Sequence, residues 1–475
     1  MYGLGVNRLG VPSGKSNPAV HSFSISDLFG SSEEGGWYDP SDASTVFSDT
    51  SGTTAATIGG VVGKILDKSG NDLHLTANAD NRRPLWGREP TSGARNFLEN
   101  SNKLTTSDIS DSGDGWVRST FTGTNLTGTA TSDDPPVGTG TVHKVACSST
   151  AVIGIQQTQN YFVDENQVLS VYLKLTGEGS TDCKGLLVTA GENCQASVRL
   201  DTETITLSGS STSNVVSSSL TDVGDDWYRL VMTINQSGNT QPILFYFIDS
   251  SNNYYTFYSS TPSILIYRPQ LEKGTSVTTA QETGLVASVG SANTAILDAT
   301  EEGYGHYHYL YFDGTDAIGN TNSFTSNEAT VVISAEIEDD TQSAIVQQNV
   351  TLANGFSLWT NYDSTNKLLS VSKGIAAGIT STLSYPLKNI FTLTADSAND
   401  SVTANIGGGT PPDASNTSIQ TAGYVSSGDL SVGSYSYTGV TTFKGKIYAL
   451  VVRDTETEGS ELIDTETAIK AKAGL

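Results

Sequence analysis

The chain has 475 residues, and its 50 acidic residues outnumber 25 basic ones, so the net charge at pH 7 is −25. At about 150 residues per domain, this length predicts roughly two to four domains. The 14 Phe, 20 Tyr and 5 Trp supply apolar volume for packed cores, which excludes a disordered acidic chain. Nucleic acids and anionic membrane surfaces need a basic face, so we expect neither as a partner and no insertion into a membrane.

The cysteines and the apolar runs restrict where the protein is assembled. Cys147, Cys183 and Cys194 are too few for a disulfide framework, so we expect free, half-buried thiols and assembly in a reducing cytoplasm. The runs Ile243–Ile248 and Ile447–Val452 are too short to cross a membrane as helices. The first residues lack the continuous apolar core of a signal peptide. Release by cell lysis would reconcile a surface-type composition with the lack of such a signal.

The first 92 residues begin with a segment of little periodicity. Residues 1–34 are rich in Gly and Ser, and we expect them to form an extended arm that orders only against another chain. Residues 35–92 alternate short apolar patches with turn signals, and Val61–Asp67 is predicted as a strand. The segment Asp67–Asp72 then predicts a tight polar loop.

Residues 93–283 carry alternating apolar and polar segments separated by turns, which is typical of an antiparallel sandwich or jelly roll. The strands expected here are Val168–Leu175, Leu186–Thr189, Ala196–Leu200, Thr204–Leu207, Trp227–Ile234, Ile243–Ile248 and Ser263–Tyr267.

Residues 284–475 repeat this pattern and end in a helix. The expected strands are Tyr307–Phe312, Thr330–Glu338, Gly355–Trp359, Ile390–Ala395, Ser401–Ile406 and Gly445–Val452. In Ser460–Ala473, Leu462, Ile463 and Ile469 recur at helical spacing, with acidic residues early and lysines late, as the helix dipole favours.

Five short motifs share one pattern. They are the WYDPSD start at Trp37, the loop DKSGN, an RP stretch ending at Pro84, FDGTD from Phe312, and FKGKIY from Phe443 before the last helix. Together they resemble the concanavalin A-like (laminin-G-like) domains of tailed-phage structural proteins. In that pattern the FDG strand follows the RP stretch closely, whereas here the two are far apart. We therefore expect residues 93–283 to be a domain inserted into a sandwich made of residues 35–92 plus 284–475.

The inserted segment has motifs of its own: GWVR at Gly115–Arg118, DWYRLVMTI at Asp226–Ile234 and a PQLE-containing run at Arg268–Thr283. They resemble the carbohydrate-binding-module-like jelly rolls of phage tail fibres. Trp227 is expected to be a core anchor beside Trp116. The predicted fold is all-β: two β-sandwich (jelly-roll) domains, one nested in the other, with a short C-terminal helix and an extended N-terminal arm.

The segment Ile243–Tyr258 is a candidate glycan site. Aromatic side chains alternate between the two faces of its second half, and rings of this kind stack on the C–H faces of sugars while Asp and Asn bond hydroxyls. The predicted residues are Tyr254, Tyr255, Phe257, Tyr258, Asp249, Asn252 and Asn253. The alternative interpretation is an aromatic-rich strand of the sandwich with one solvent-exposed face.

Acidic turns are candidate calcium sites, because calcium takes carboxylate and carbonyl oxygens. The residues are Asp67, Asn71, Asp72, Asp313 and Asp316. These residues do not have the spacing of an EF-hand loop. The alternative interpretation is that Asp, Asn and Gly are present because they suit the backbone of tight turns. His306 and His308 share a strand face that zinc can use, but no third ligand is near in sequence, and exposed polar positions are the default.

Catalysis is the rival hypothesis. Glycoside hydrolysis needs two carboxylates across a cleft, and Glu336 and Glu338 share a strand face, as in the acidic strand of concanavalin-like glucanases. The run departs from the glucanase pattern, and no neighbouring Trp cluster marks a substrate cleft. The simpler interpretation is an exposed acidic strand end.

The resemblances imply a non-enzymatic virion protein, a tail or head fibre that contacts host surface glycans. It would be made in the host cytoplasm, released by lysis and face the exterior. Residues 1–34 would attach it to other virion proteins, and a homo-oligomer, with a trimer favoured, would display it. Calcium is the one cofactor considered. The alternatives are a polysaccharide depolymerase and an architectural decoration without a ligand.

Overall fold

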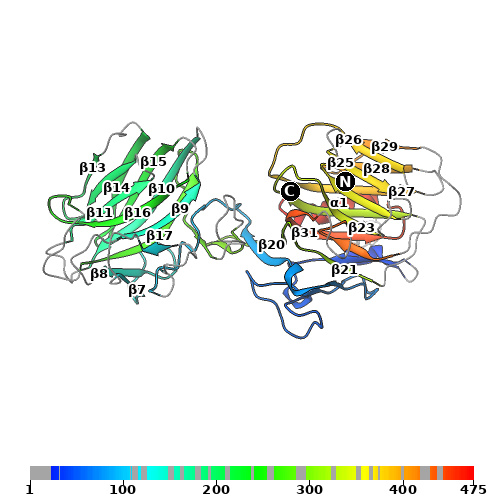
Figure 1. The fold of residues 1–475 in the computed structure, drawn as a ribbon, viewed down its shortest axis with the longest axis horizontal. Helices are drawn as coiled ribbons and strands as arrows, with labels where there is room; N and C mark the ends of the chain where they lie inside the picture. The colour runs from blue at the N-terminus through cyan, green and yellow to red at the C-terminus, as the bar shows by residue number, and fades with distance from the viewer. Residues whose placement is uncertain are drawn as a thin grey trace, which may run out of the picture.

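The computed structural model describes residues 23–30, 33–106, 109, 116–118, 126–147, 154–160, 165–176, 183–190, 194–208, 214–236, 240–253, 262–284, 296–321, 328–348, 355–362, 367–372, 375–396, 401–417, 428–435 and 442–475. This part of the chain is all-β, as predicted: its named strands pair antiparallel in four large sheets and one two-stranded ribbon (Figure 1). Within it lie one α-helix and three short 3₁₀ helices, η1 (Ile25–Leu28), η2 (Ala43–Thr45) and η3 (Asp80–Arg82). None of the described helices is long and apolar enough to cross a membrane.

The larger sandwich packs an eight-stranded sheet A on a nine-stranded sheet B. Sheet A has the order β29-β28-β27-β22-β31-β20-β5, and β1 also pairs with β31. Its strands are β29 (Ala414–Asn416), β28 (Ser401–Ile406), β27 (Leu387–Asp396), β22 (Ala329–Ile337), β31 (Lys444–Arg453), β20 (His306–Asp313), β5 (Leu85–Pro90) and β1 (Gly35–Tyr38). Sheet B runs β2 (Val46–Phe47), β3 (Lys64–Ile65), β4 (Leu75–Ala77), β21 (Ile318–Asn320), β30 (Leu430–Val432), β23 (Ser343–Gln348), β24 (Phe356–Thr360), β25 (Leu368–Ser372) and β26 (Ile375–Ile379).

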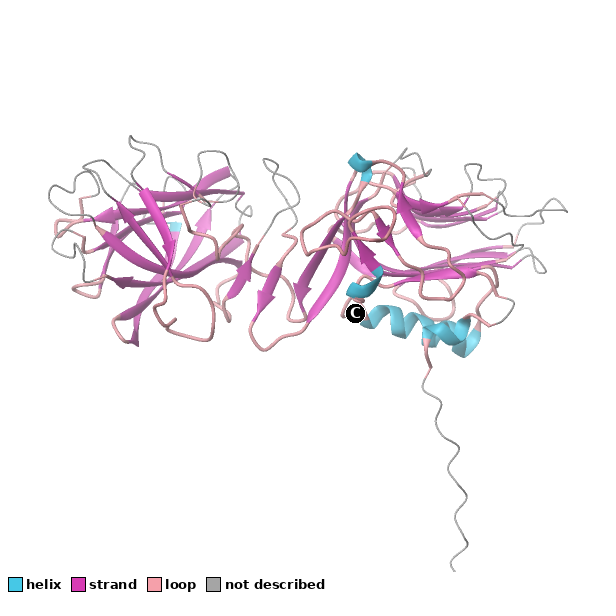
Figure 2. Ribbon diagram, turned by 90° about the horizontal axis from the view of Figure 1, so that it is seen from below, coloured by secondary structure: helices cyan, strands magenta, loops and turns pink. Residues whose placement is uncertain are grey.

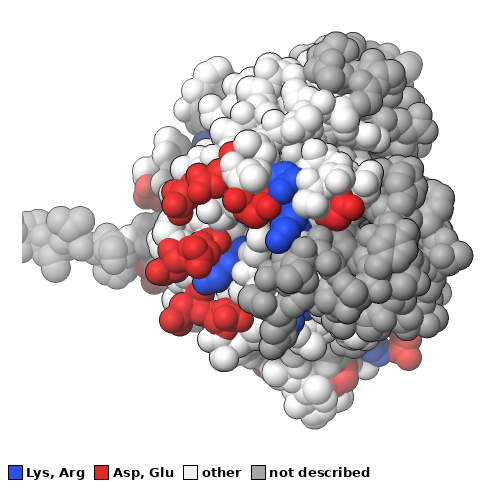
Figure 3. All heavy atoms as spheres, turned by 90° about the vertical axis from the view of Figure 1, so that its left-hand side faces the viewer, with Lys and Arg blue, Asp and Glu red and all other residues white. Residues whose placement is uncertain are grey.

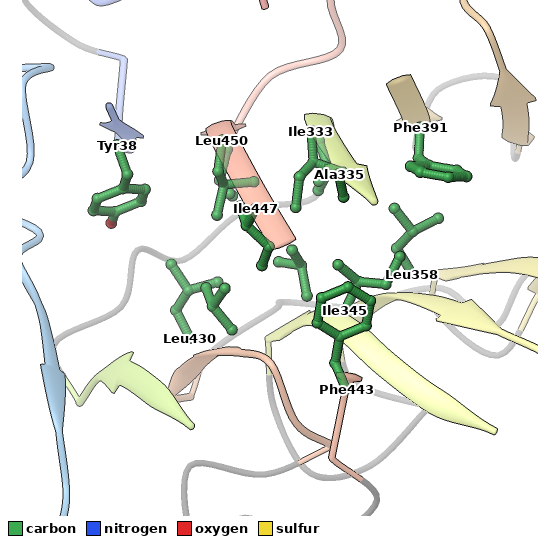
Figure 4. Packing of buried hydrophobic residues seen from close by; sticks show 14 of the residues in the cluster. Tyr38, Ile333, Ala335, Ile345, Leu358, Phe391, Leu430, Phe443, Ile447 and Leu450 are labelled. Carbon is green, nitrogen blue, oxygen red and sulfur yellow. The ribbon is translucent and has the colours of Figure 1, made fainter. Parts of the chain in front are cut away.

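The core of the larger sandwich draws on both ends of the chain. Tyr38 and Trp86 from the first segment pack in the same cluster as Phe312, Phe391 and Phe443 from the last one. Figure 4 shows Tyr38, Phe391 and Phe443 in this cluster. Strand alternation produces this arrangement, because every second residue of each strand faces the opposite sheet.

The smaller sandwich, called the module here, packs two six-stranded sheets around a separate core. Sheet C comprises β13 (Thr204–Ser208), β12 (Gln195–Arg199), β11 (Gly185–Ala190), β16 (Thr240–Ile248), β9 (Gly154–Asn160) and β6 (Val117–Arg118), in that order. Sheet D comprises β14 (Val215–Gly224), β15 (Trp227–Gln236), β10 (Glu165–Leu175), β17 (Ser263–Lys273), β8 (His143–Cys147) and β7 (Leu126–Ala130). The ribbon of β18 (Gln281–Thr283) and β19 (Ala299–Glu301) links the module to the larger sandwich, because β18 contacts β17 and β19 contacts β5. Independent folding of residues 93–283 stays a prediction.

Trp227 is buried, but it does not lie beside Trp116 as expected. Trp116 packs on Phe245 in the module core, with ring centroids 5.7 Å apart. Trp227 belongs to a different cluster with Tyr172 and Tyr267. The reason is strand alternation: Leu230, Met232 and Ile234 of β15 face the module core, so Trp227 lies on the opposite face of sheet D.

The outer face of sheet A is covered by the two chain ends. Ile25 and Leu28 of η1 pack with Ile469 of α1 (Gly459–Ala471) against this face, and Figure 2 shows the helix lying along the sheet. Arg453 fixes the contact, because its Nη2 donates to the Leu28 carbonyl at 2.8 Å. The expectation that residues 1–34 order only against another chain is therefore wrong from residue 23 onward. Residues 1–22 lie outside the described part.

Most expected strands are present, but several details differ. The strand expected at Val61–Asp67 shrinks to the two residues of β3, and the serine-rich β14 was not expected. In α1, Ile463 is 46% exposed, so it does not belong to the buried helix face. The three cysteines form no disulfide, as expected, but they are fully rather than half buried, and burial raises the pKa of Cys183 to about 12.

Candidate functional site

The predicted glycan edge is described only in its first half. Tyr254, Tyr255, Phe257 and Tyr258 lie outside the described residues. Asp249, Asn252 and Asn253 form a closed turn after β16, in which Asp249 Oδ1 accepts N–H bonds from Ser251 at 2.7 Å and from Asn253 at 2.9 Å. Asn252 has a positive φ of 63°, which Asn tolerates better than most residues. The carboxylate of Asp249 therefore fixes the shape of this turn.

Strand β16 leads into that turn, and its Tyr246 lies on the outer face of sheet C, where it is only 6% exposed. Tyr246 pairs across the strands with Gly154 on one side and Leu187 on the other. A Cβ atom at position 154 would lie 2.6 Å from Cδ1 of Tyr246, so the ring occupies the space above the glycine. Tyr246, Leu187, Ile248 and Leu244 form an apolar cluster separate from the module core.

Uncharged polar side chains border this cluster. Thr189 and Gln156 both pair with Leu244, and Ser197 pairs with Leu187, so all three share the outer face. The hydroxyl of Thr189 is buried and has no hydrogen-bond partner among the described residues. A buried hydroxyl without a partner costs free energy, which marks this position as unusual.

A charged rim closes one end of the face. Arg199 on β12 contacts Asp201 at 2.7 Å through both Nε and Nη2, and its Nη1 also binds the carbonyl of Ser250 in the Asp249 turn. Figure 3 views the molecule from the module side and shows acidic side chains gathered around fewer basic ones. We call the Tyr246 cluster, its polar border and this rim the sheet C face.

The predicted calcium residues lie in two separate turns. The carboxylate of Asp67 accepts bonds from the backbone N–H groups of Trp37, Ser69 and Leu73, and Asn71 donates to backbone carbonyls, so these side chains hold the loop closed. Asp72 is exposed in that loop with a positive φ of 58°.

In the second turn, Asp316 accepts the N–H of Asp313 at 2.9 Å. Burial raises the pKa of Asp316 to about 8, and the negative charge of Asp313 adds to the shift. Among the described residues, no group of three or more His, Cys, Asp or Glu side chains is arranged to hold a metal ion.

The outer face of sheet A carries a network of buried charges that the sequence did not indicate. Glu89 on β5 contacts Lys388 on β27 at 2.7 Å and Lys446 on β31 at 3.0 Å, and it accepts the hydroxyl of Tyr448 at 2.9 Å. Burial alone would raise the pKa of Glu89, but the two lysines outweigh it and hold the pKa at about 2. Because β5 and β27 are far apart in the strand order, their contact shows that the sheet is strongly curved.

The suspected catalytic pair belongs to this network. Glu336 contacts Lys446 at 3.1 Å, and Glu338 contacts Lys444 at 3.3 Å and accepts the Tyr311 hydroxyl at 3.3 Å. Burial raises the pKa of Glu338 despite Lys444. Each carboxylate thus already has a lysine partner.

Sequence reasoning identified the faces of single strands but not the contacts between distant segments. His306 and His308 were placed on one face of their strand, and Tyr307, Tyr309 and Tyr311 of β20 pack together on the other. Strand alternation gave no sign that Glu89 would meet Lys388, because nothing local links them. Tyr246 lies within the predicted segment but was not among the predicted site residues. Its cross-strand pairing with Gly154, which makes room for the ring, is visible only in the structure.

Comparison with known proteins yields only distant likenesses. No protein-family profile matches the sequence, and no curated protein matches it. A CBM40 module of the Ruminococcus gnavus IT-sialidase, bound to α2,3-sialyllactose, is 16% identical with a TM-score of 0.21, covering 29% of this chain and 82% of that one.

Two further solved structures extend over more of the chain. The CBM22 tandem of Paenibacillus barcinonensis Xyn10C is 10% identical with a TM-score of 0.22, covering 74% of this chain and 96% of its own. The tail fibre protein gp63.1 of an E. coli phage is 9% identical with a TM-score of 0.17, covering 81% of this chain and 41% of that one. Carbohydrate-binding modules and a phage fibre are thus among the neighbours, but TM-scores near 0.2 support no functional conclusion.

Proposed function

We propose that this chain is a non-enzymatic adhesion protein that binds cell-surface glycans through the sheet C face of its module. One observation carries the proposal: the outer face of sheet C groups a small apolar cluster, in which Leu244 is half-buried and Tyr246 is 6% exposed, with the uncharged hydrogen-bonding side chains of Gln156, Thr189 and Ser197. A sugar presents an apolar C–H face surrounded by hydroxyls, so it complements an apolar centre with a polar border. The rigid Asp249 turn and the Arg199–Asp201 pair supply further hydrogen-bonding groups at the rim.

Thr189→Val tests this proposal, since valine matches threonine in shape and removes only the hydroxyl. If the hydroxyl serves a ligand, affinity for the glycan should fall by roughly tenfold, the value of one hydrogen bond. The melting temperature should hold or rise, because a buried hydroxyl without a partner is removed. The measurement is a glycan-array screen of the full chain, followed by titration of the best ligand and thermal melts.

Thr221→Val is the matched control, because Thr221 is an exposed strand residue on sheet D. Its affinity and melting temperature should equal those of the wild type. Tyr254→Ala and Tyr255→Ala complete the series and test the predicted edge beyond the described turn. Unchanged affinity in all three site variants would show that the glycan binds elsewhere.

A second candidate is glycoside hydrolysis at Glu336 and Glu338. One observation favours hydrolysis: the pKa of Glu338 is raised, and a second carboxylate lies on the same strand face. A glycosidase needs one protonated and one ionised carboxyl group, so the pKa values of the two must differ. The lysine partner of each carboxylate favours a structural role instead. New reducing ends formed from a polysaccharide by the wild type, and lost in Glu338→Gln, would support catalysis.

The place on a particle is also part of the proposal. We infer that the protein is a virion fibre component, presented to the exterior after lysis as a homo-oligomer, with a trimer favoured. Residues 1–22 would attach it to other virion proteins, because residues 23–30 pack on this chain's own sheet A. Deleting residues 1–22 should leave a folded protein that no longer joins the particle, whereas normal incorporation would remove the anchor hypothesis.

Calcium binding at the Asp67 and Asp313 turns remains a proposal. The raised pKa of Asp316 means that calcium binding there would release a proton. Calorimetric titration in two buffers of different ionisation heat would reveal that proton.

A further inference from the structure

Strand β14 lies at one edge of sheet D, and its outer side is open. Among the described residues β14 pairs only with β15, so the backbone N–H and C=O groups on its other side have no strand partner there. With ten residues it is the longest edge strand of the described sheets, since the next longest, β5, has six. Most of its side chains are exposed, so solvent reaches this edge. An open edge of this length is a template for another strand.

Two other edge strands are covered by neighbouring segments of the chain. On β7, at the opposite edge of sheet D, the N–H of Gly128 donates to Thr106 Oγ1 at 3.0 Å, and its carbonyl accepts the Thr106 N–H at 2.7 Å. On β5, the N–H of Arg88 donates to the Leu297 carbonyl at 2.8 Å. Within the described residues β14 has no such contact on its outer side. Its edge is therefore not protected against pairing in the way that these two are.

The composition of β14 also lacks the residues that usually prevent edge pairing. The strand reads VVSSSLTDVG, with no lysine, arginine or proline, and Asp222 is its one charged residue in a chain of net charge −25. Its pairing with β15 is irregular between Val215 and Ser217 and again between Asp222 and Gly224. The stretch between these irregularities is regular, so it can pair with a further strand, and the irregularities limit that pairing to its length.

The regular stretch of β14 complements a second copy of itself. Leu220 packs against the module core, so alternation puts Ser217, Ser219 and Thr221 on the exposed outer face. In an antiparallel pair related by a two-fold axis through Ser219, each Ser219 lies opposite its equivalent and each Ser217 lies opposite Thr221 of the other copy. Opposed Ser and Thr side chains hydrogen-bond across antiparallel strands. The exposed face would therefore form a row of matched hydroxyl groups across the contact.

Charge favours the antiparallel over the parallel arrangement. In the antiparallel pair Asp222 lies opposite Val216 of the other copy, so the two Asp222 carboxylates are about 20 Å apart along the strands. Salt screens charges beyond about 8 Å at physiological ionic strength, so these two hardly repel each other. In a parallel pair, Asp222 and the following Asp225 and Asp226 would each face their equivalents. Val216 is 57% exposed, and Leu207 of the adjacent β13 is 36% exposed, so both add apolar area to the contact.

We propose that β14 binds β14 of a second copy of this chain in the antiparallel arrangement, which joins two copies of sheet D into one continuous sheet. The contact uses no residue of the sheet C face, so it does not depend on glycan binding. If that face binds glycans, the paired modules present two sites and gain avidity. The contact is also separate from attachment through residues 1–22. In a trimer held there, β14 would link modules of neighbouring trimers.

Sedimentation velocity of the full chain over a range of protein concentrations tests whether copies associate. We expect self-association that strengthens from low to high salt, because salt screens the repulsion between two chains that each carry a net charge of −25. Hydrogen exchange at low and high protein concentration locates the contact, and the amides of Val215–Gly224 should gain protection at the higher concentration. A monomer under all these conditions, or association that leaves β14 unprotected, would overturn the proposal.

Charge substitutions at the two-fold axis separate lost pairing from misfolding. Ser219→Lys and Ser219→Asp each put like charges opposite each other, so each should weaken self-association by roughly fivefold, although they change the net charge in opposite directions. A mixture of the two variants puts a lysine opposite an aspartate and should restore association as a heterodimer. Thr127→Lys and Thr127→Asp are the matched controls, because Thr127 is exposed on β7 at the opposite edge of sheet D, and both should associate as the wild type does. Unchanged association in the Ser219 variants, or a mixture that does not restore it, would contradict the antiparallel pairing.

Discussion

Buried carboxylates in this chain differ according to the charges beside them. Glu89 has two lysine partners, which keep it ionised with a pKa of about 2. Asp316 has no cation beside it among the described residues, and burial next to Asp313 raises its pKa to about 8. The same type of group is therefore charged at neutral pH in one place and protonated in the other.

Asp316 should make stability fall with rising pH. Between the ordinary pKa of about 4 and the folded value, the unfolded chain has released this proton while the folded chain keeps it, so unfolding is favoured as pH rises, by about 1 kcal/mol per pH unit. Asp316→Asn removes that dependence and should be more stable than the wild type at pH 8, with a smaller gain at pH 5. Urea unfolding at both pH values measures this. An equal difference at both pH values would mean that Asp316 does not hold the proton.

At the scale of strands, glycine and aromatic residues pair across the sheets. Gly87 of β5 faces Tyr309 of β20, as Gly154 of β9 faces Tyr246 of β16. In both pairs a Cβ atom on the glycine would overlap the tyrosine ring. These glycines make room for rings that lie flat on the sheet, so they cannot be replaced without moving the ring.

Gly87→Ala should therefore destabilise the larger sandwich by about 1–3 kcal/mol, the usual cost of overpacking. Tyr309 is fully buried and donates its hydroxyl to the Ile296 carbonyl at 2.9 Å, so it has little freedom to shift. Gly305→Ala is the control for the loss of a glycine without a positive φ, since the nearest atom to a Cβ there is Thr91 Cγ2 at 3.6 Å, an ordinary contact. If Gly87→Ala melts at or above the temperature of Gly305→Ala, the ring does not depend on the glycine.

The sequence predicted those elements that local patterns specify. Alternation located β10, β15 and β22 within a few residues, since their apolar faces are regular. It missed β14, because the run of serines gives that exposed edge strand no apolar period. Contacts between distant segments were beyond local reasoning: the ring centroids of Tyr435 and Trp359 lie 5.1 Å apart only because β30 pairs with β23 and β23 with β24.

At the scale of the whole molecule, the ribbon β18–β19 and an ion network join module and larger sandwich. Arg95 contacts Glu301 at 2.6 Å and Glu272 at 3.7 Å, and Gln281 donates to Glu301 at 3.1 Å. Glu301 is almost fully buried, so these bonds are little exposed to screening by salt. We infer that the junction restrains the two sandwiches relative to each other.

Arg95→Ala should loosen the junction without unfolding either sandwich. The carboxylate of Glu301 would lose its cation, and its pKa, which is now lowered despite burial, should rise. Small-angle X-ray scattering of Arg95→Ala should show a broader distribution of distances between the two sandwiches. Lys144 is a module residue outside this network, so Lys144→Ala should leave the distance distribution unchanged. An unchanged scattering profile in Arg95→Ala would mean that the ribbon alone sets the geometry.

The central claim is that this protein binds glycans and does not cleave them. The most direct measurement is affinity electrophoresis of the full chain in gels containing a bacterial surface polysaccharide, with reducing ends assayed in the same samples. We predict retarded migration that weakens in Thr189→Val, with no new reducing ends. Unretarded migration across a panel of such polysaccharides, or reducing ends that disappear in Glu338→Gln, would contradict the claim.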